Sequence, residues 1–248
     1  MRWLSAAAGK EVAAALAASR ALLAFDFDGT LAPIVADRTR ATMKASTRAL
    51  LAAACRRYPV VVVSGRARAD VGARVAGLGV KVVVGNHGIE PASATRAMAR
   101  AVASTRSALA QALEGTPGVE LEDKRFSLSV HFRRAPRPEL ARRAILAAIA
   151  RLSVPVRTIP GKRLVNVLPA GAPDKGDAVL RLADQARAAR VLYVGDDATD
   201  EAVFRLRDRR LVTVRVGRAA ASEASWYLRR QEDLDALLAA LCSAREGP

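Results

Sequence analysis

The sequence has little of what would indicate a secreted, disulfide-bonded or zinc-binding protein. Its 248 residues include only 2 cysteines, Cys55 and Cys242, in unrelated contexts without metal-like spacing. A reducing cytoplasm fits this composition. Long apolar runs are missing as well, because Lys10, Glu11 and Arg20 interrupt the alanine-rich first residues and no secretory h-region is present. We therefore expect a soluble, cytoplasmic protein with a short first helix and no membrane partner.

Aromatic residues are also scarce, at 4% of the chain, although the formal net charge of +16 invites a nucleic-acid-binding interpretation. Single-stranded bases stack on aromatic side chains, and few are present here. The arginines are dispersed in short groups on predicted helical or loop surfaces, which favours solvated faces over a phosphate-binding patch. We predict no nucleic-acid partner; a basic protein that binds phosphate or nucleic acid remains the alternative from a different class.

The chain is organised around residues 22–34, with the sequence LLAFDFDGTLAPI. Residues 22–25 form a short apolar run followed by a glycine turn, which is typical of a buried parallel strand. Asp26 and Asp28 lie two residues apart in an extended segment, so their side chains project to the same side. Such carboxylates repel each other unless a cation lies between them or one holds a proton. We therefore expect a divalent metal and an anionic substrate here.

Two further apolar runs end in small or polar residues. After a predicted helix at 43–57, the valines at 60–63 are followed by SGR at 64–66, and the run at 80–84 is followed by GNHG at 85–88. Because the carboxyl ends of parallel strands lie at one edge of an open α/β sheet, we expect these loops to contribute to one site.

From about residue 91 the pattern changes to that of a small α+β unit. The alternation in FSLSVHF, residues 126–132, indicates a half-exposed antiparallel sheet. We predict a core domain of residues 1–90 and 170–248 and an inserted αββαββ domain of residues 91–169. The predicted elements of the insert are a helix at 92–113, strands at 119–121 and 126–132, a helix at 139–152, and strands at 154–159 and 163–168.

The parallel pattern resumes after the insert. The predicted fold class is therefore α/β: a Rossmann-like parallel sheet with helices on both faces, plus the inserted α+β unit as a cap. The elements predicted here are a helix from Lys175 to Ala189, a strand at 191–194 followed by GDDATDE at 195–201, a strand at 211–216 and a helix at 231–241.

Four separated segments carry groups that suit phosphoryl transfer, which mostly requires positioning and charge stabilisation. Carboxylates provide a nucleophile and an acid/base, a hydroxyl can bind phosphate oxygens, a lysine supplies positive charge, and an acidic group suits a hard cation such as Mg²⁺. Together these parts predict a phosphatase. The residues are Asp26 and Asp28, then Ser64, then Lys175, and finally Asp196, Asp197 and Asp200.

These motifs resemble those of the haloacid dehalogenase superfamily, with DFDGT, Ser64, Lys175 and GDDATD as its four motifs in order. More narrowly, DFDGTLAPI, SGR, GNHG, EDKRFSLSVHFR, DKG and GDDATDEAVF resemble trehalose-6-phosphate phosphatases, whose cap is inserted between the second and third motifs. The resemblance covers nearly all of the chain. It implies Mg²⁺-dependent hydrolysis of trehalose 6-phosphate to trehalose and phosphate through an aspartyl phosphate, in trehalose biosynthesis.

The resemblance also implies a role for each matching residue. Asp26 would attack phosphorus, Asp28 would protonate the leaving sugar oxygen and then deprotonate water, and Lys175 would neutralise charge. The residues implied for phosphate are Thr30, Ser64 and Gly65; those for Mg²⁺ are Asp26, the Asp28 carbonyl, Asp196, Asp197 and Asp200; those for the sugar are Arg66, Asn86, His87, Glu122, Lys124, Arg133 and Asn166.

One position departs from the family's pattern. Where the family commonly has V-x-E-x-R-P, this chain has Asn166 and Leu168 before Pro169. An amide donates as well as accepts hydrogen bonds, so the sugar contacts of the cap are tuned differently. Another capped sugar phosphatase of the same superfamily is therefore the alternative among enzymes, and association with a trehalose-6-phosphate synthase is left open.

Overall fold

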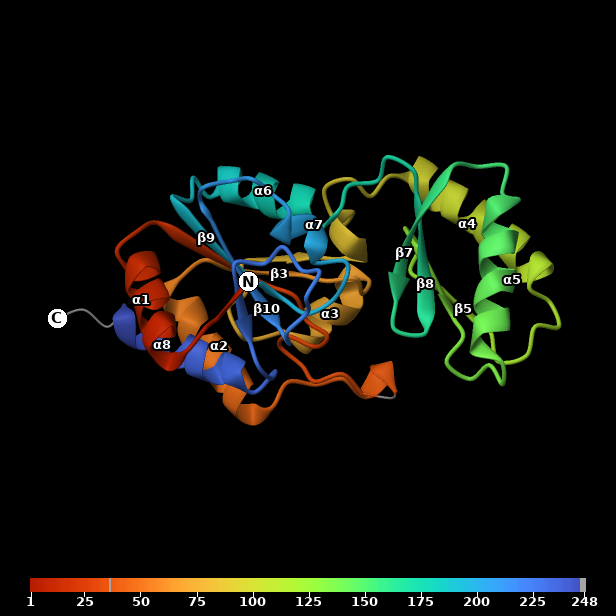
Figure 1. Ribbon diagram of the computed structural model, residues 1–248. Helices are drawn as coiled ribbons and strands as arrows, with labels where there is room; N and C mark the ends of the chain where they lie inside the picture. Colours follow the sequence, from red (N-terminus) through yellow and green to blue (C-terminus); the bar gives the residue numbers. More distant parts are fainter. Residues whose placement is uncertain (36, 246–248) are drawn as a thin grey trace. The chain divides into compact units, whose positions relative to one another are not determined.

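The computed structural model describes residues 1–35 and 37–245 (Figure 1). The chain divides into two compact units. We call Met1–Gly88 together with Asp174–Pro248 the core unit, and Ile89–Pro173 the inserted unit.

The core unit is built on a seven-stranded sheet in which all neighbouring strands are parallel. The strand order is β1-β11-β10-β9-β2-β3-β4, so β2 lies near the middle. The chain moves from β2 towards β4 on one side and returns at β9 on the other, which makes the β2–β9 boundary a switch point of the sheet. The strands are β1 (Arg2–Trp3), β2 (Ala21–Phe25), β3 (Val60–Val63), β4 (Val82–Val84), β9 (Arg190–Gly195), β10 (Leu211–Val216) and β11 (Trp226–Leu228).

Both faces of this sheet are buried, which explains why its strands are continuous apolar runs. In β2, Leu23 and Phe25 belong to one hydrophobic cluster, whereas Leu22 and Ala24 belong to another on the opposite face. Figure 1 shows α1, α2 and α8 on one face and α6 on the other. The helices of this unit are α1 (Ala6–Ala17), η1 (Arg38–Arg40), α2 (Ala45–Arg57), α3 (Arg68–Arg74), η2 (Asn86–Gly88), α6 (Lys175–Gln185), α7 (Glu201–Phe204) and α8 (Asp233–Ala244).

The predicted fold class is confirmed, and one local prediction for the core unit needs correction. Helix α6 ends at Gln185 and does not reach Ala189, because Arg187 adopts a positive φ of 46°, outside the helical region. Strands β1 and β11 were not predicted, because their two and three residues are too few to show the two-residue alternation of a strand.

The inserted unit consists of a four-stranded antiparallel sheet and two helices. Its strand order is β5-β6-β8-β7. Val130 of β6 and Val165 of β8 pack with Val102 and Ile145 of the helices in one hydrophobic cluster. The elements are α4 (Arg96–Ala112), β5 (Glu120–Asp123), β6 (Leu128–His131), α5 (Pro138–Ala150), β7 (Val156–Gly161) and β8 (Leu164–Pro169).

The expectation that residues 126–132 form a half-exposed strand is wrong. Ser127, just before β6, and Ser129 within it are both fully buried, although they alternate with apolar residues. Ser129 is compatible with burial because its hydroxyl donates a hydrogen bond to Asn166 Oδ1 at 2.7 Å.

No helix within the described residues has the length and apolar character needed to cross a membrane.

Candidate active site

The centre of the candidate site is a buried contact between Asp26, which follows β2, and Lys175, the first residue of α6. Lys175 Nζ donates hydrogen bonds to Asp26 Oδ1 and to Asp200 Oδ1, both at 2.8 Å. The side chains of Asp26, Lys175 and Asp200 are 6%, 2% and 0% exposed. Two residues separated by the whole inserted unit in the sequence are therefore in direct contact within the core unit.

Burial and neighbouring charges control the ionisation of this pair. Burial raises the pKa of Asp26 well above its ordinary value, against the opposing effect of Lys175. Burial alone would lower the pKa of Lys175, but the carboxylates of Asp200 and Asp26 raise it well above its ordinary value. Lys175 is therefore a lasting positive charge beside the Asp26 carboxylate.

Asp200 holds this arrangement together. Its Oδ1 accepts hydrogen bonds from Lys175 and, at 2.6 Å, from the hydroxyl of Tyr193 in β9. Its Oδ2 accepts from the backbone N–H groups of Asp196 and Asp197 at 2.8 and 3.0 Å. Burial opposes ionisation, but Lys175 and the other donors keep the pKa of Asp200 below its ordinary value. Asp200 thus connects the lysine to the acidic loop after β9.

Asp196 is the residue of that loop with an unused oxygen. Its Oδ1 is buried and has no hydrogen-bond partner within the part of the chain that the structure describes. Oxygens of Asp26, Asp196 and Asp200 lie within 4.8 Å of one another, and burial, then Asp26, raises the pKa of Asp196 well above its ordinary value. Three carboxylates at this separation fit a hard cation. By contrast, Asp197 Oδ1 accepts from the N–H and hydroxyl of Thr199 at 2.7 and 2.6 Å, closing a local turn.

The loop after β2 brings Thr30 to the same edge of the sheet. Gly29 has a φ of 81°, and a Cβ on this residue would overlap the Asp196 carboxylate, so the position requires glycine. The Thr30 hydroxyl is buried and has no partner among residues 1–35 and 37–245. Gln231 anchors the loop by donating from Nε2 to the Thr30 carbonyl at 2.9 Å. A buried hydroxyl in this state can donate to an anion.

The loops after β3 and β4 pack against each other. The backbone N–H of His87 donates to the Ser64 carbonyl at 3.0 Å. A Cβ on Gly65 would lie 2.5 Å from Cε1 of the His87 ring, so this close approach also depends on a glycine. Asn86 and His87 are buried in η2 and have positive φ values of 51° and 60°. Their predicted contact with a sugar remains a prediction.

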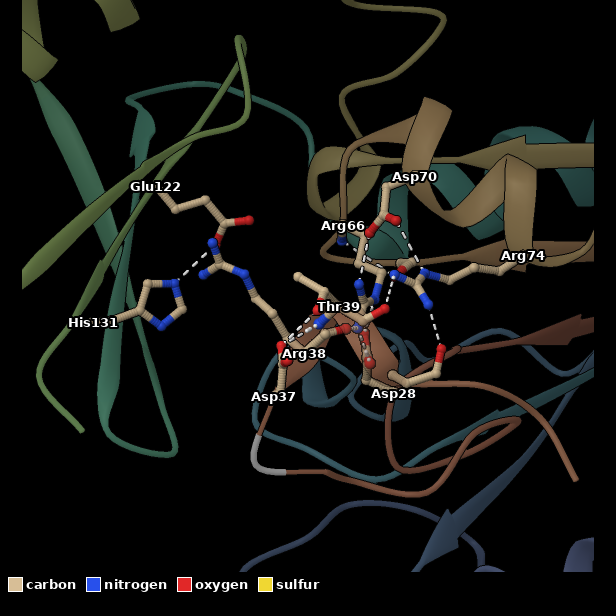
Figure 2. Close-up of polar contacts among 11 residues, drawn as sticks. Asp28, Asp37, Arg38, Thr39, Arg66, Asp70, Arg74, Glu122 and His131 are labelled. Atoms are coloured by element: carbon tan, nitrogen blue, oxygen red, sulfur yellow. Dashed lines mark hydrogen bonds and ion pairs between the residues drawn. The ribbon is translucent and has the colours of Figure 1, made fainter. Parts of the chain in front are cut away.

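Asp28 is held by Arg66, as Figure 2 shows. Arg66 Nε and Nη2 donate to Asp28 Oδ2 and Oδ1, each at 2.7 Å, and Nη1 donates to Asp70 Oδ2 at 2.6 Å. Burial alone would lower the pKa of the Arg66 guanidinium, but its hydrogen bonds and ion pairs with Asp28 and Asp70 keep that pKa above its ordinary value. The predicted contact of Arg66 with substrate remains a prediction, and its guanidinium engages Asp28 and Asp70.

The sugar-binding candidates of the inserted unit lie on β5 and β8 and on the segments that follow β5 and β6. His131 Nε2 and Glu122 Oε2 are 2.8 Å apart (Figure 2). Glu122 is paired in register with Ser129, and Ser129 with Asn166. Asn166 is buried. Lys124 lies in the turn between β5 and β6, and Arg133 is exposed after β6.

Several residues with a role in positioning this site were missed by the sequence analysis. Tyr193 looks like core in an apolar strand, and nothing in the local pattern indicates that its hydroxyl binds Asp200. Glu201, the first residue of α7, is buried, and it accepts from Arg215 Nη1 at 3.2 Å and from the Glu223 N–H at 3.1 Å. Arg215 also donates to the Asp197 carbonyl at 3.2 Å. These contacts support the acidic loop from β10.

A parallel sheet with an inserted unit and an acidic edge of this kind defines the capped fold of haloacid dehalogenase-like hydrolases. The family model for trehalose-phosphatase matches residues 24–229, and the chain belongs to the trehalose-phosphatase family.

Known proteins agree with this assignment. The trehalose-phosphate phosphatase of Mycobacterium ulcerans (strain Agy99) is 36% identical over 203 residues, which cover 76% of this chain and 52% of that protein. Probable trehalose-phosphate phosphatase 9 of Oryza sativa subsp. japonica is 32% identical over 235 residues, 79% of this chain and 62% of that protein. The chain thus spans about half to three fifths of the length of these curated relatives.

The fold also matches a solved structure. The C-terminal domain of trehalose-6-phosphate phosphatase from C. albicans superposes with a TM-score of 0.77 at 22% sequence identity, over 94% of this chain and 96% of that one.

Proposed function

We propose that this chain is a Mg²⁺-dependent phosphatase that hydrolyses trehalose 6-phosphate to trehalose and phosphate in trehalose biosynthesis. The observation that carries the proposal is the buried Asp26–Lys175 contact at the switch point of the sheet, beside an Asp196 oxygen that has no partner in the described part of the chain. Membership of the trehalose-phosphatase family supports the choice of substrate. We further propose that the protein acts in the cytoplasm and that a trehalose-6-phosphate synthase is a candidate partner.

The proposed reaction has two steps. An Asp26 carboxylate oxygen attacks phosphorus, the bond between phosphorus and the sugar oxygen breaks, and Asp28 gives that oxygen a proton. Water then attacks the aspartyl phosphate and passes a proton to Asp28, and the Asp26–phosphorus bond breaks to release phosphate. Lys175 stabilises the negative charge of Asp26 and of the phosphoryl group throughout.

The residues present fit a divalent metal. Asp26 and Asp196 would hold Mg²⁺ with the Asp28 carbonyl, because the buried Asp196 Oδ1 has no other partner in the described chain. The metal would supply charge stabilisation for the transferring phosphoryl group. Asp200 and Asp197 are proposed to support it, Asp200 by holding the backbone of the loop.

Phosphate binding falls to small groups around this centre. Thr30 offers a buried hydroxyl that has no partner among the described residues. Ser64 and Gly65 offer a hydroxyl and a backbone N–H in the tight loop after β3. We propose that these three residues hold the phosphate oxygens.

We propose that the inserted unit acts as the cap domain and selects the sugar. Glu122, Lys124 and Arg133 provide charged groups that suit sugar hydroxyls. Asn86 and His87 of the core unit remain candidates for the same role, whereas Arg66 has a different proposed role, described below.

The hydrogen bonds of Asn166 favour a second candidate substrate. Its Oδ1 accepts from Ser129 at 2.7 Å, and its Nδ2 lies 3.5 Å from the Ile159 carbonyl. An amide engaged within the sheet presents less to a sugar than the glutamate that the family commonly has there. A phosphatase acting on another phosphorylated sugar is therefore the alternative, and a panel of sugar phosphates distinguishes the two.

The test is phosphate release from trehalose 6-phosphate and from a panel of other sugar phosphates, with Mg²⁺ and with a chelator. We expect turnover that requires Mg²⁺ and is fastest on trehalose 6-phosphate. Asp26→Asn should lower kcat by at least about a thousandfold, because a neutral amide of the same size is not a nucleophile. Its thermal unfolding should remain cooperative. Absence of phosphate release from every sugar phosphate, or wild-type turnover in Asp26→Asn, would overturn the proposal.

A further inference from the structure

Asp28 belongs to a chain of four alternating charges. Arg66 uses Nε and Nη2 on the two oxygens of Asp28 and Nη1 on Asp70 Oδ2, and Arg74 Nε donates to Asp70 Oδ1 at 3.0 Å (Figure 2). Asp70 lies in the first turn of α3, four residues after Arg66 and four before Arg74. One short helix therefore determines the position of the guanidinium that contacts Asp28.

The far end of this chain is attached to the backbone. Arg74 donates to the Ala41 carbonyl and, at 3.2 Å, to the Thr39 carbonyl. Arg66 Nη2 also donates to the Arg38 carbonyl at 2.9 Å. The residues 38–41 that supply these carbonyls follow the loop that carries Asp28, so the network links α3 to the segment after the first motif.

Asp70 limits the freedom of Arg66. An arginine side chain has several rotatable bonds and loses considerable entropy when it is held in one geometry. With Nη1 on Asp70, the guanidinium edge formed by Nε and Nη2 faces Asp28, which matches the planar fork to both carboxylate oxygens. Arg66 and Arg74 keep the pKa of Asp70 below its ordinary value, against the effect of burial, so Asp70 remains a carboxylate at neutral pH.

We propose that Asp70 is a positioning residue for Asp28, acting through Arg66. This inference rests on the proposed function, in which Asp28 gives a proton to the leaving oxygen. Asp70 holds Arg66, and Arg66 fixes the orientation of the Asp28 side chain through both of its oxygens. One Asp28 oxygen exchanges its Arg66 hydrogen bond for the proton that it gives to the sugar oxygen, while the other oxygen keeps the side chain in place. Neither Asp70 nor Arg66 takes part in a covalent bond that forms or breaks.

The reactivity of the leaving group provides a specific readout. Acid assistance matters greatly for a sugar hydroxyl, which is a strongly basic leaving group, and little for nitrophenolate, which leaves readily without a proton. The parameter kcat/KM reports the steps up to departure of the leaving group, whereas the later hydrolysis of the aspartyl phosphate is common to both substrates.

The experiment compares Asp70→Asn with wild type on trehalose 6-phosphate and on 4-nitrophenyl phosphate, both with Mg²⁺. We expect kcat/KM for the sugar phosphate to fall about tenfold and that for the aryl phosphate to change less than about twofold, because misplaced acid catalysis affects only the former. Arg66→Lys should show the same selectivity, since an ammonium does not engage both oxygens as a planar fork does.

Asp208→Asn is the matched control. Asp208 accepts from Arg210 Nε at 3.1 Å and from Nη2 at 2.7 Å, so this variant also removes a carboxylate from an arginine network. Asp208 precedes β10, at the sheet edge opposite to the carboxyl ends of the strands. We expect its ratio of the two kcat/KM values to equal that of wild type.

Two results would contradict the inference: an equal fall on both substrates in Asp70→Asn, or no change on either. A wild-type protein that releases phosphate from neither substrate would instead overturn the proposed function itself. Failure of this inference would therefore be seen in Asp70→Asn, whereas failure of the proposed function would already be seen in the wild-type protein.

Discussion

At the scale of single residues, the site depends on buried charged groups that are held by several hydrogen bonds each. Asp200 accepts four hydrogen bonds, from Lys175, Tyr193 and two backbone N–H groups. Tyr193 is fully buried, and burial, followed by Asp200, raises the pKa of its hydroxyl well above the ordinary value. The Tyr193 hydroxyl therefore remains protonated and acts as a donor that orients Asp200, and through it Lys175.

Tyr193→Phe should therefore reduce turnover as well as stability. Loss of a buried hydrogen bond to a charged group costs about 1–3 kcal/mol of the free energy of unfolding. Because Asp200 also orients Lys175, we expect kcat on trehalose 6-phosphate to fall about tenfold, as one misdirected electrostatic group would cause. Urea unfolding and steady-state kinetics measure the two effects.

Tyr58→Phe is the control for this variant. The Tyr58 hydroxyl is also buried, and it donates to the Leu241 carbonyl at 3.0 Å. Its removal should lower stability by a similar amount, about 1 kcal/mol, and leave kcat unchanged. If both variants kept wild-type kcat, the positioning role of Tyr193 would be excluded.

At the scale of elements, the site is assembled from turns that follow parallel strands. The turn η2 after β4 packs against the start of α6, where a Cβ on Gly88 would overlap the Asp174 backbone. Asp174 caps α6, and Asp174 and Asp177 form a reciprocal capping box. Helix α6, whose first residue is Lys175, thus begins at a defined position and packs against the turn that follows β4.

The contact between Gly65 and the His87 ring can be tested by adding one methyl group. In Gly65→Ala the new Cβ would lie 2.5 Å from the ring, so we expect a loss of about 1–3 kcal/mol in the free energy of unfolding from overpacking. Gly72→Ala is the control, since no atom lies within 4 Å of its added Cβ in α3. That variant should gain about 0.5–1 kcal/mol from helix propensity. Equal stabilities for the two variants would show that the turns adjust without cost.

At the scale of the whole molecule, the proposed function places the chemistry in the core unit and the choice of sugar in the inserted unit. Glu122→Ala should raise KM for trehalose 6-phosphate by about tenfold or more, as expected for a lost charge-assisted hydrogen bond. KM for 4-nitrophenyl phosphate should change little, because an aryl phosphate has no sugar hydroxyls. Asp123→Ala is the control: Asp123 is next in β5 and points to the other face, where its Oδ2 lies 3.6 Å from Arg106 Nε of α4. Parallel changes in KM for both substrates would remove Glu122 from sugar recognition.

Much of the fold could be predicted because its signals are local. The apolar runs of β2, β3 and β9 and the small or acidic residues after them indicate parallel strands with a site at their carboxyl ends. Short elements such as β11, the end of α6 at Gln185 and the burial of Ser129 were not predictable. Each of these features depends on a neighbouring strand or on a single backbone angle, and the hydrophobic periodicity of the sequence does not indicate either.

The sequence by itself determined the class of the core, the order of the motifs and the residue types available for chemistry, because these follow from local periodicity and from residues adjacent in the chain. Only the tertiary structure decided which of these side chains contact each other. Lys175 meets Asp26 across 149 residues, and Arg66 meets Asp28 across 38. Such contacts depend on how the strands pair and how the helices pack. For that reason the sequence did not indicate that Arg66 engages the Asp28 carboxylate, or that Tyr193, which looks like core, reaches the centre of the site.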